Sequence, residues 1–99
     1  MVHESSGMVY AVKDGVERFT VGDRVAAHNP VCNECYYCKR GLNSLCENLI
    51  LNNHHNRACG KYQFIPKEIV RQNTFHLPDD MSFKQAALLE PFASAVYAQ

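Results

Sequence analysis

Four cysteines share one short segment of this chain in the spacing C-x2-C-x2-C-x7-C. They are Cys32, Cys35, Cys38 and Cys46. Zinc binds four thiolates in a tetrahedron, and a short loop can supply all four while leaving no open coordination position. The spacing therefore predicts a structural zinc site, in which the metal holds the loop in shape and takes no part in catalysis.

Two other uses of the cysteines compete with zinc. Disulfides belong to oxidising compartments, but the start of the chain has no basic segment, apolar run and cleavage site in succession. Disulfides would also leave Cys59 over, and pairing residues three apart gives poor disulfide geometry. A redox C-x-x-C is the second alternative, and its repetition within one loop argues against it. Cys59 itself is interpreted as a small apolar residue.

Composition limits the classes of partner. A chain of 99 residues with 46% hydrophobic and 20% charged residues is typical of one small globular domain. Ten basic and ten acidic residues cancel, so the sequence lacks the positive charge that nucleic-acid binding needs. No apolar run approaches membrane-spanning length. We therefore expect a cytoplasmic protein that binds neither nucleic acid nor membrane.

Basic and aromatic side chains within the cysteine segment have two interpretations each. Lys39 and Arg40 follow the third cysteine, where they could offset the negative charge of four thiolates around zinc. They could equally be solvated loop charges. Tyr36 and Tyr37 could form a protein contact surface or could simply cover the thiolates. The sequence leaves both questions open.

Strand signals dominate the rest of the chain outside its C-terminal part. The β-rich run at residues 7–12 precedes a turn at Gly15, and a second turn at Gly22 precedes a strand at residues 25–27. Residues 61–65 alternate between polar and apolar, which predicts a half-buried strand that ends at the following proline.

Helix signals appear near the C-terminus. Ser82 and Gln85 have the spacing of a capping box, which predicts a helix through residues 83–89. Pro91 can occupy the first turn of a further helix that runs to residue 99. Since no glycine or asparagine ends that helix, we expect that it continues in a longer protein.

Several motifs occur in a characteristic order. They are His3-Glu4-x-x-Gly7, Gly22-Asp23-Arg24-Val25, the cysteine quartet with Gly41, Leu77-Pro78-Asp79-Asp80, and Ala86-Ala87-Leu88-Leu89-Glu90-Pro91. Together they resemble the medium-chain, zinc-dependent alcohol and polyol dehydrogenases, and in particular the branch of the sorbitol and threonine dehydrogenases.

This resemblance implies a mainly β fold. In the family, the catalytic domain is a partly closed, GroES-like β-barrel that packs against a Rossmann domain. Residues 1–99 would form part of that catalytic domain, as an incomplete barrel with a zinc-binding loop at residues 32–46 and C-terminal helices. The Rossmann domain is absent, because no segment supplies the G-x-G-x-x-G pattern.

The resemblance also implies a second, catalytic zinc site. His3 is similar to the family's histidine ligand, and Glu4 to the adjacent acidic residue, a ligand or near-ligand and thus the candidate catalytic side chain. Glu90 resembles the glutamate ligand of the sorbitol and threonine dehydrogenases. This site is incomplete, because the family's cysteine ligand would precede the chain. Asn33 replaces a family glycine, and asparagine tolerates positive φ better than other residues.

Two functions follow from these interpretations. In the first, the chain is a fragment of a dehydrogenase that oxidises a polyol or secondary alcohol to a ketone with NAD(P) and zinc. The fragment alone is then expected to be inactive, to bind no NAD(P), and to self-associate through its unfinished C-terminal helix. In the second, the chain is a zinc-stabilised structural or interaction module without enzymatic activity.

Overall fold

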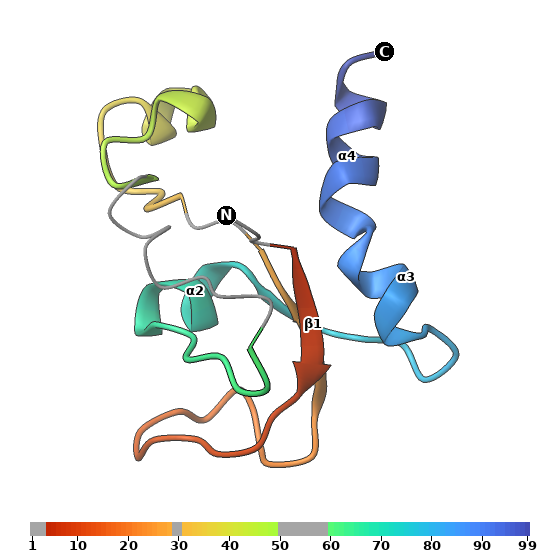
Figure 1. Ribbon diagram of the computed structural model, residues 1–99. Coiled ribbons are helices and arrows are strands. Elements are labelled where there is room, and N and C mark those ends of the chain that lie inside the picture. Colours follow the sequence, from red (N-terminus) through yellow and green to blue (C-terminus); the bar gives the residue numbers. More distant parts are fainter. Residues whose placement is uncertain (1–3, 29–30, 50–59) are drawn as a thin grey trace.

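The computed structural model describes residues 4–28, 31–49 and 60–99. At its centre is an antiparallel sheet of three strands, with the second strand in the middle. The strands are β1 (Ser5–Met8), β2 (Arg24–Ala27) and β3 (Thr74–His76). Figure 1 shows the cysteine loop and the C-terminal helix on opposite sides of this sheet. Residues 31–49, which carry the four cysteines, therefore form a separate lobe away from the sheet.

Strand β1 begins and ends earlier than the sequence predicts. It covers Ser5–Met8 in place of residues 7–12, because its partner β2 begins at Arg24, which is opposite Met8. Two further backbone bonds extend the pairing, from Val9 N to Asp23 O and from Gly22 N to Val9 O, both at 2.8 Å. Beyond them the chain leaves the sheet.

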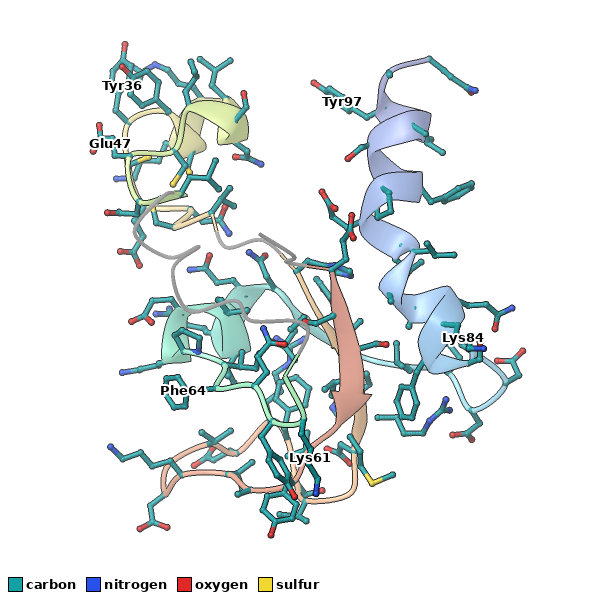
Figure 2. All side chains as sticks on the ribbon, viewed as in Figure 1. Tyr36, Glu47, Lys61, Phe64, Lys84 and Tyr97 are labelled. Atoms are coloured by element: carbon teal, nitrogen blue, oxygen red, sulfur yellow. The ribbon has the colours of Figure 1, made fainter. Side chains whose placement is uncertain are left out.

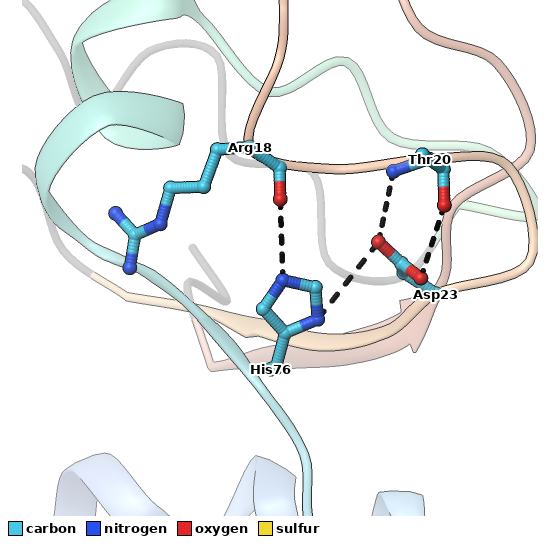
Figure 3. Close-up of polar contacts among 4 residues, drawn as sticks. All are labelled: Arg18, Thr20, Asp23 and His76. Carbon is cyan, nitrogen blue, oxygen red and sulfur yellow. Dashed lines mark hydrogen bonds and ion pairs between the residues drawn. The ribbon is translucent and has the colours of Figure 1, made fainter.

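The turn that precedes β2 is fastened to β3 by a small polar network (Figure 3). Asp23 accepts hydrogen bonds from the backbone N of Thr20 at 2.8 Å and from its hydroxyl at 3.2 Å. His76 lies between the two segments, with Nδ1 3.8 Å from Asp23 and Nε2 3.3 Å from the carbonyl of Arg18. Gly22 has φ of 97°, so the predicted glycine turn is confirmed.

Two helices follow β3 in the chain. Helix α3 (Phe83–Ala87) begins with the predicted capping box, in which Ser82 accepts from the N–H of Gln85 and the Gln85 side chain accepts from that of Ser82. Helix α4 (Leu89–Tyr97) begins before Pro91, which therefore lies in its first turn. Both C-terminal helices are confirmed, although the first ends at Ala87 and Leu89 already belongs to the second.

The apolar core lies where α3 covers the sheet. Ala26 of β2 and Ala86 of α3 are fully buried, and Leu77 beside them is buried to all but 8%. Met81 and Leu89 pack against this group. Small side chains at the contact let the helix approach the sheet closely, so burial of these residues fixes α3 in place.

Arg24 ties the segment between β3 and α3 to the sheet. Its guanidinium donates to the carbonyls of Pro78 at 3.2 Å, Asp79 at 3.1 Å and Met81. The same group lies 4.8 Å from the ring centroid of Phe83. A planar fork of five donors is suited to this set of acceptors.

Helix α2 (Lys67–Gln72) was not predicted, and the strand predicted just before it is wrong. Residues 61–65 form no strand, and Phe64 is 75% exposed. The apolar residues Tyr62 and Phe64 are both exposed, so the alternation in the sequence marks no buried face of a sheet. Pro66, expected to end that strand, is instead the residue before α2, where a proline costs no hydrogen bond.

The sheet and helices agree with the predicted fold class only in part. Strands of four, four and three residues are outweighed by α-helices of six, five and nine in the described ranges. These three strands form an open sheet, so no barrel is seen in the part of the chain that the structure describes. Closing a barrel requires further strands with matched tilt and register. Among the described residues, no helix has the length and apolar character needed to cross a membrane.

Candidate metal centre

The structure brings the four cysteines together in the lobe that lies away from the sheet. Two short 3-10 helices, η1 (Cys38–Arg40) and η2 (Asn43–Leu45), bend the chain so that Cys46 returns to Cys32. The four Sγ atoms all lie within 4.8 Å of one another. The predicted clustering of the quartet is therefore confirmed.

The distances between sulfur atoms fit tetrahedral zinc. A Zn–S bond of about 2.3 Å puts sulfur atoms about 3.8 Å apart in a regular tetrahedron. The Sγ of Cys32 lies 3.6 Å from that of Cys46 and 3.9 Å from that of Cys38. Four sulfur donors are the set that structural zinc sites use, so the cluster is consistent with such a site.

The backbone around Cys32 is folded so that N–H groups point at its sulfur atom. The N–H groups of Glu34 and Cys35 lie 3.5 Å and 3.3 Å from Cys32 Sγ. The turn that directly follows Cys32 places Asn33 at φ 56°, in the left-handed region. Asparagine is among the few non-glycine residues that accept this conformation, as the sequence indicated.

The thiols of the cluster differ in acidity. The N–H groups of Glu34 and Cys35 lower the pKa of Cys32 from 9.0 to about 6, since they stabilise its thiolate. Backbone hydrogen bonds, first from Cys38, also lower the pKa of Cys35. Desolvation raises the pKa of Cys38 to about 12. One cysteine is therefore ready to ligate a cation at neutral pH, whereas Cys38 loses its proton only when a cation arrives.

Aromatic and basic side chains cover the outer end of the lobe (Figure 2). The guanidinium of Arg40 stacks 3.6 Å from the ring centroid of Tyr36, and Tyr36 meets Tyr37 edge-on at 5.4 Å. Tyr36 is 59% exposed, and Lys39 and Arg40 are exposed as well. Tyr36 is thus accessible, and both interpretations of Tyr36 and Tyr37, as cover for the thiolates or as a contact surface, stay predictions.

The predicted ligands of a catalytic zinc are only partly described. His3 lies outside the described residues. Glu4 is half-buried immediately before β1, and Glu90 is half-buried in the first turn of α4. Within the described ranges, the cysteine quartet is the group of three or more candidate ligands that the structure brings within reach of one ion. The role of His3, Glu4 and Glu90 therefore stays a prediction.

Two polar residues at the site were not foreseen. The Asn48 side chain hydrogen-bonds to the Cys32 thiolate and helps to lower its pKa. Gln72, at the end of α2, donates to the carbonyl of Cys32. Asn48 follows the fourth cysteine so closely that its reach could have been anticipated, but Gln72 is 40 residues from Cys32 and carries no local signal.

Known proteins are similar to this chain along almost its whole length. L-threonine 3-dehydrogenase of Idiomarina loihiensis is 37% identical over 97 residues, and sorbitol dehydrogenase of Bacillus subtilis is 35% identical over 99 residues. These matches cover 96% and 97% of this chain but 27% of each relative. The chain thus spans about a quarter of the length of these dehydrogenases.

A solved structure agrees with the fold. The crystal structure of galactitol-1-phosphate dehydrogenase from Escherichia coli superimposes with a TM-score of 0.68 at 34% identity, covering 97% of this chain and 27% of that protein. The alcohol dehydrogenase GroES-like domain matches residues 1–76, a span that includes all four clustered cysteines. The chain therefore belongs to the GroES-like domain family of the medium-chain, zinc-dependent alcohol dehydrogenases.

Proposed function

We propose that this chain is part of the catalytic domain of a zinc-dependent dehydrogenase that oxidises a polyol or secondary alcohol to a ketone with NAD(P). Residues 1–99 would supply the structural zinc loop at residues 32–46, and the Rossmann cofactor domain would lie outside them. The cysteine cluster supports this proposal most directly, because its sulfur spacing suits zinc and its residues fall in the matched domain.

The structural zinc would stabilise the lobe and not the transition state. Four thiolates fill a tetrahedron, so no position is left for water or substrate. Cys32, Cys35, Cys38 and Cys46 would hold this ion. The lobe carries little apolar burial of its own, since Cys46 is its one buried residue in the part of the chain that the structure describes. Metal binding would then provide much of its folding energy.

The catalytic zinc would be held by His3, Glu4 and Glu90 with a cysteine from elsewhere in the complete protein. Imidazole nitrogen and carboxylate oxygen are both good zinc ligands. When bound, such a zinc polarises the substrate hydroxyl. NAD(P), bound elsewhere in the complete protein, would accept the hydride from the carbinol carbon, and the hydroxyl proton would be released. Glu4 immediately precedes β1 and Glu90 lies in the first turn of α4, so each is close to regular structure.

The chain's flanking coding sequence provides the test. A β-rich segment with a cysteine before Met1, and a G-x-G-x-x-G segment after Gln99, would support the dehydrogenase. The protein encoded by that longer frame should reduce NAD(P) in the presence of a polyol such as sorbitol. Glu90→Gln should abolish this activity while zinc content falls by one ion per chain. Stop codons on both sides would overturn the proposal.

A zinc-stabilised module without enzymatic activity is the second candidate. One observation favours it: the quartet is complete and assembled within these residues. Stop codons on both sides, with a single tightly bound zinc, would support the module. Polyol-dependent reduction of NAD(P) by the encoded protein would contradict it.

A further inference from the structure

The side chain of Gln72 connects helix α2 to the cysteine lobe. Its Nε2 atom donates to the backbone carbonyl of Cys32 at 3.1 Å, and its Oε1 atom accepts from Nδ2 of Asn33 at 2.7 Å. We propose that Gln72 is a positioning residue for the zinc site, which holds the backbone of the first ligand in its metal-binding conformation and slows loss of the ion. This proposal rests on the zinc-binding role proposed above.

The bonds of Gln72 cross a polar cleft. A cavity of about 340 Å³ separates α2 from the lobe. Glu34 and Asn48 line it from the lobe, and Lys67, Glu68 and Arg71 line it from α2. The residues that line this space carry charged or amide groups, together with Cys32. A bridging amide is then a direct restraint between them.

Gln72 acts on the part of the loop whose conformation is most demanding. Cys32 and Asn33 form the turn at which φ of Asn33 is 56°. That turn aims the N–H groups of Glu34 and Cys35 at the sulfur of Cys32. Gln72 bonds to both Cys32 and Asn33, which lie on either side of the peptide bond at the start of this turn. Releasing it would let the turn relax to negative φ and misdirect both the sulfur and its N–H donors.

Helix α2, which carries Gln72, is itself attached to the sheet. Ile69, one turn earlier in α2, is 1% exposed. Its carbonyl accepts from the backbone N of Asn73 at 2.8 Å and from the hydroxyl of Thr74 at 3.0 Å. Thr74 is the first residue of β3, so α2 is fastened directly to the sheet. A ligand loop that is already restrained by such a helix loses less conformational entropy when it closes on a metal.

The experiment measures the rate at which the zinc-loaded protein gives up zinc to an excess of the chromogenic chelator 4-(2-pyridylazo)resorcinol. Gln72→Met keeps the length and helix propensity of the side chain but removes both hydrogen bonds. At the usual net strength of a neutral hydrogen bond, losing two should speed release by roughly fivefold to 150-fold. Asn33→Gly keeps the positive φ accessible and removes one bond, so it should speed release by a smaller factor.

Two further variants separate positioning from general stability. Gln72→Glu can still accept from Asn33 but cannot donate to Cys32, and its carboxylate repels the Cys32 carbonyl, so we expect faster release than in the wild type. Gln85→Met removes another glutamine with two hydrogen bonds, those that cap α3. It should lower the melting temperature without changing the release rate. In the cobalt-substituted protein, Gln72→Met should raise the Co²⁺ concentration for half-maximal thiolate absorption by a similar factor.

The outcomes distinguish this proposal from the function on which it rests. If the wild-type protein holds no zinc, both are overturned. If it holds zinc tightly but Gln72→Met and Asn33→Gly release it at the wild-type rate, only the role of Gln72 is overturned. Equal acceleration by Gln85→Met would also overturn it, because the effect would then follow stability alone. Should Gln72→Met fail to fold, Asn33→Gly decides the question, since Asn33 is exposed.

Discussion

The sulfur atom of Cys46 accepts a hydrogen bond from the backbone N of Cys32 at 3.3 Å, while the two sulfur atoms lie 3.6 Å apart. The first and last cysteines of the quartet therefore close the lobe. Cys46 is 7% exposed, and it is the most enclosed of the four. A metal at this point would join the two ends of the loop.

Cys46→Ser, and likewise Cys38→Ser, should remove zinc from the lobe and lower its stability sharply. Structural zinc in small peptides contributes about 10–16 kcal/mol of apparent binding energy, much of it coupled to folding. Mass spectrometry under native conditions should show one zinc in the wild type and none in either variant, together with a fall in melting temperature. Cys59→Ser provides the matched control and should keep the metal. A wild-type protein that keeps its full stability after exhaustive chelation would contradict the structural role.

How much of this site could be read from the sequence depends on the range of the interactions. The quartet is local, because C-x-x-C spacing fixes its own loop, and so is the capping box of Ser82 and Gln85. Strand β3 has only three residues and no periodic pattern of its own. Its existence depends on pairing with β2, across some fifty intervening residues, which only the folded chain decides.

The overestimated strand has a physical reason of the same kind. Alternation over residues 61–65 predicted a half-buried strand, but a strand needs a neighbour to pair with. Tyr62 instead packs on Tyr10, with ring centroids 5.0 Å apart, and the segment stays irregular. Gln72 could not be predicted at all, because nothing in a helix of charged and apolar residues marks which polar side chain reaches another lobe.

Zinc uptake should release protons in a number that depends on pH. The pKa of Cys32 is lowered from 9.0 to about 6, so Cys32 is a thiolate at neutral pH. The hydrogen bonds that lower this pKa also stabilise the zinc-free fold, and their contribution is complete above pH 9. That contribution is lost as the pH falls from 9 through 6. The pKa of Cys38 is raised to about 12, so its proton remains at neutral pH and must leave when zinc binds.

Calorimetry in two buffers of different ionisation enthalpy measures this release. At pH 7.5 we expect at least one proton per zinc, from Cys38, and fewer than four, because Cys32 has already lost its proton. Below about pH 6 the number should rise and zinc affinity should fall more steeply, since Cys32 is then protonated as well. Release of four protons at pH 7.5 would contradict the acidity of Cys32.

Arg24→Lys should destabilise the fold although it preserves the charge. A lysine cannot reproduce the fork that reaches the carbonyls of Pro78, Asp79 and Met81, nor the stacking over Phe83. Hydrogen bonds to a charged group contribute about 1.5–3 kcal/mol each, and lysine should keep at most one, so we expect a loss of about 2 kcal/mol or more.

Urea unfolding measures the loss in the Arg24 variant. Arg71→Lys is the matched control, since Arg71 is exposed on α2, and it should change the free energy of unfolding by less than about 0.5 kcal/mol. Equal stability of Arg24→Lys and the wild type would show that the fork contributes nothing. Zinc content should stay unchanged in both variants, because neither residue belongs to the quartet.

The C-terminal helix should drive self-association of the isolated chain. Leu88, Phe92 and Val96 recur at a spacing of four and are 63%, 67% and 54% exposed, so they form one apolar stripe along α4. With Met81 and Leu89, the first two also line a cavity of about 550 Å³. An apolar surface of this kind favours association.

Sedimentation velocity should show dimers or larger species whose share grows with concentration. The double variant Phe92→Ser, Val96→Ser should shift the protein toward monomer, because it interrupts the stripe. Phe64→Ser, at a 75% exposed phenylalanine that lies away from α4 in Figure 2, should leave the association unchanged. A wild-type protein that sediments as a single monomeric species at high concentration would show that the stripe does not drive association.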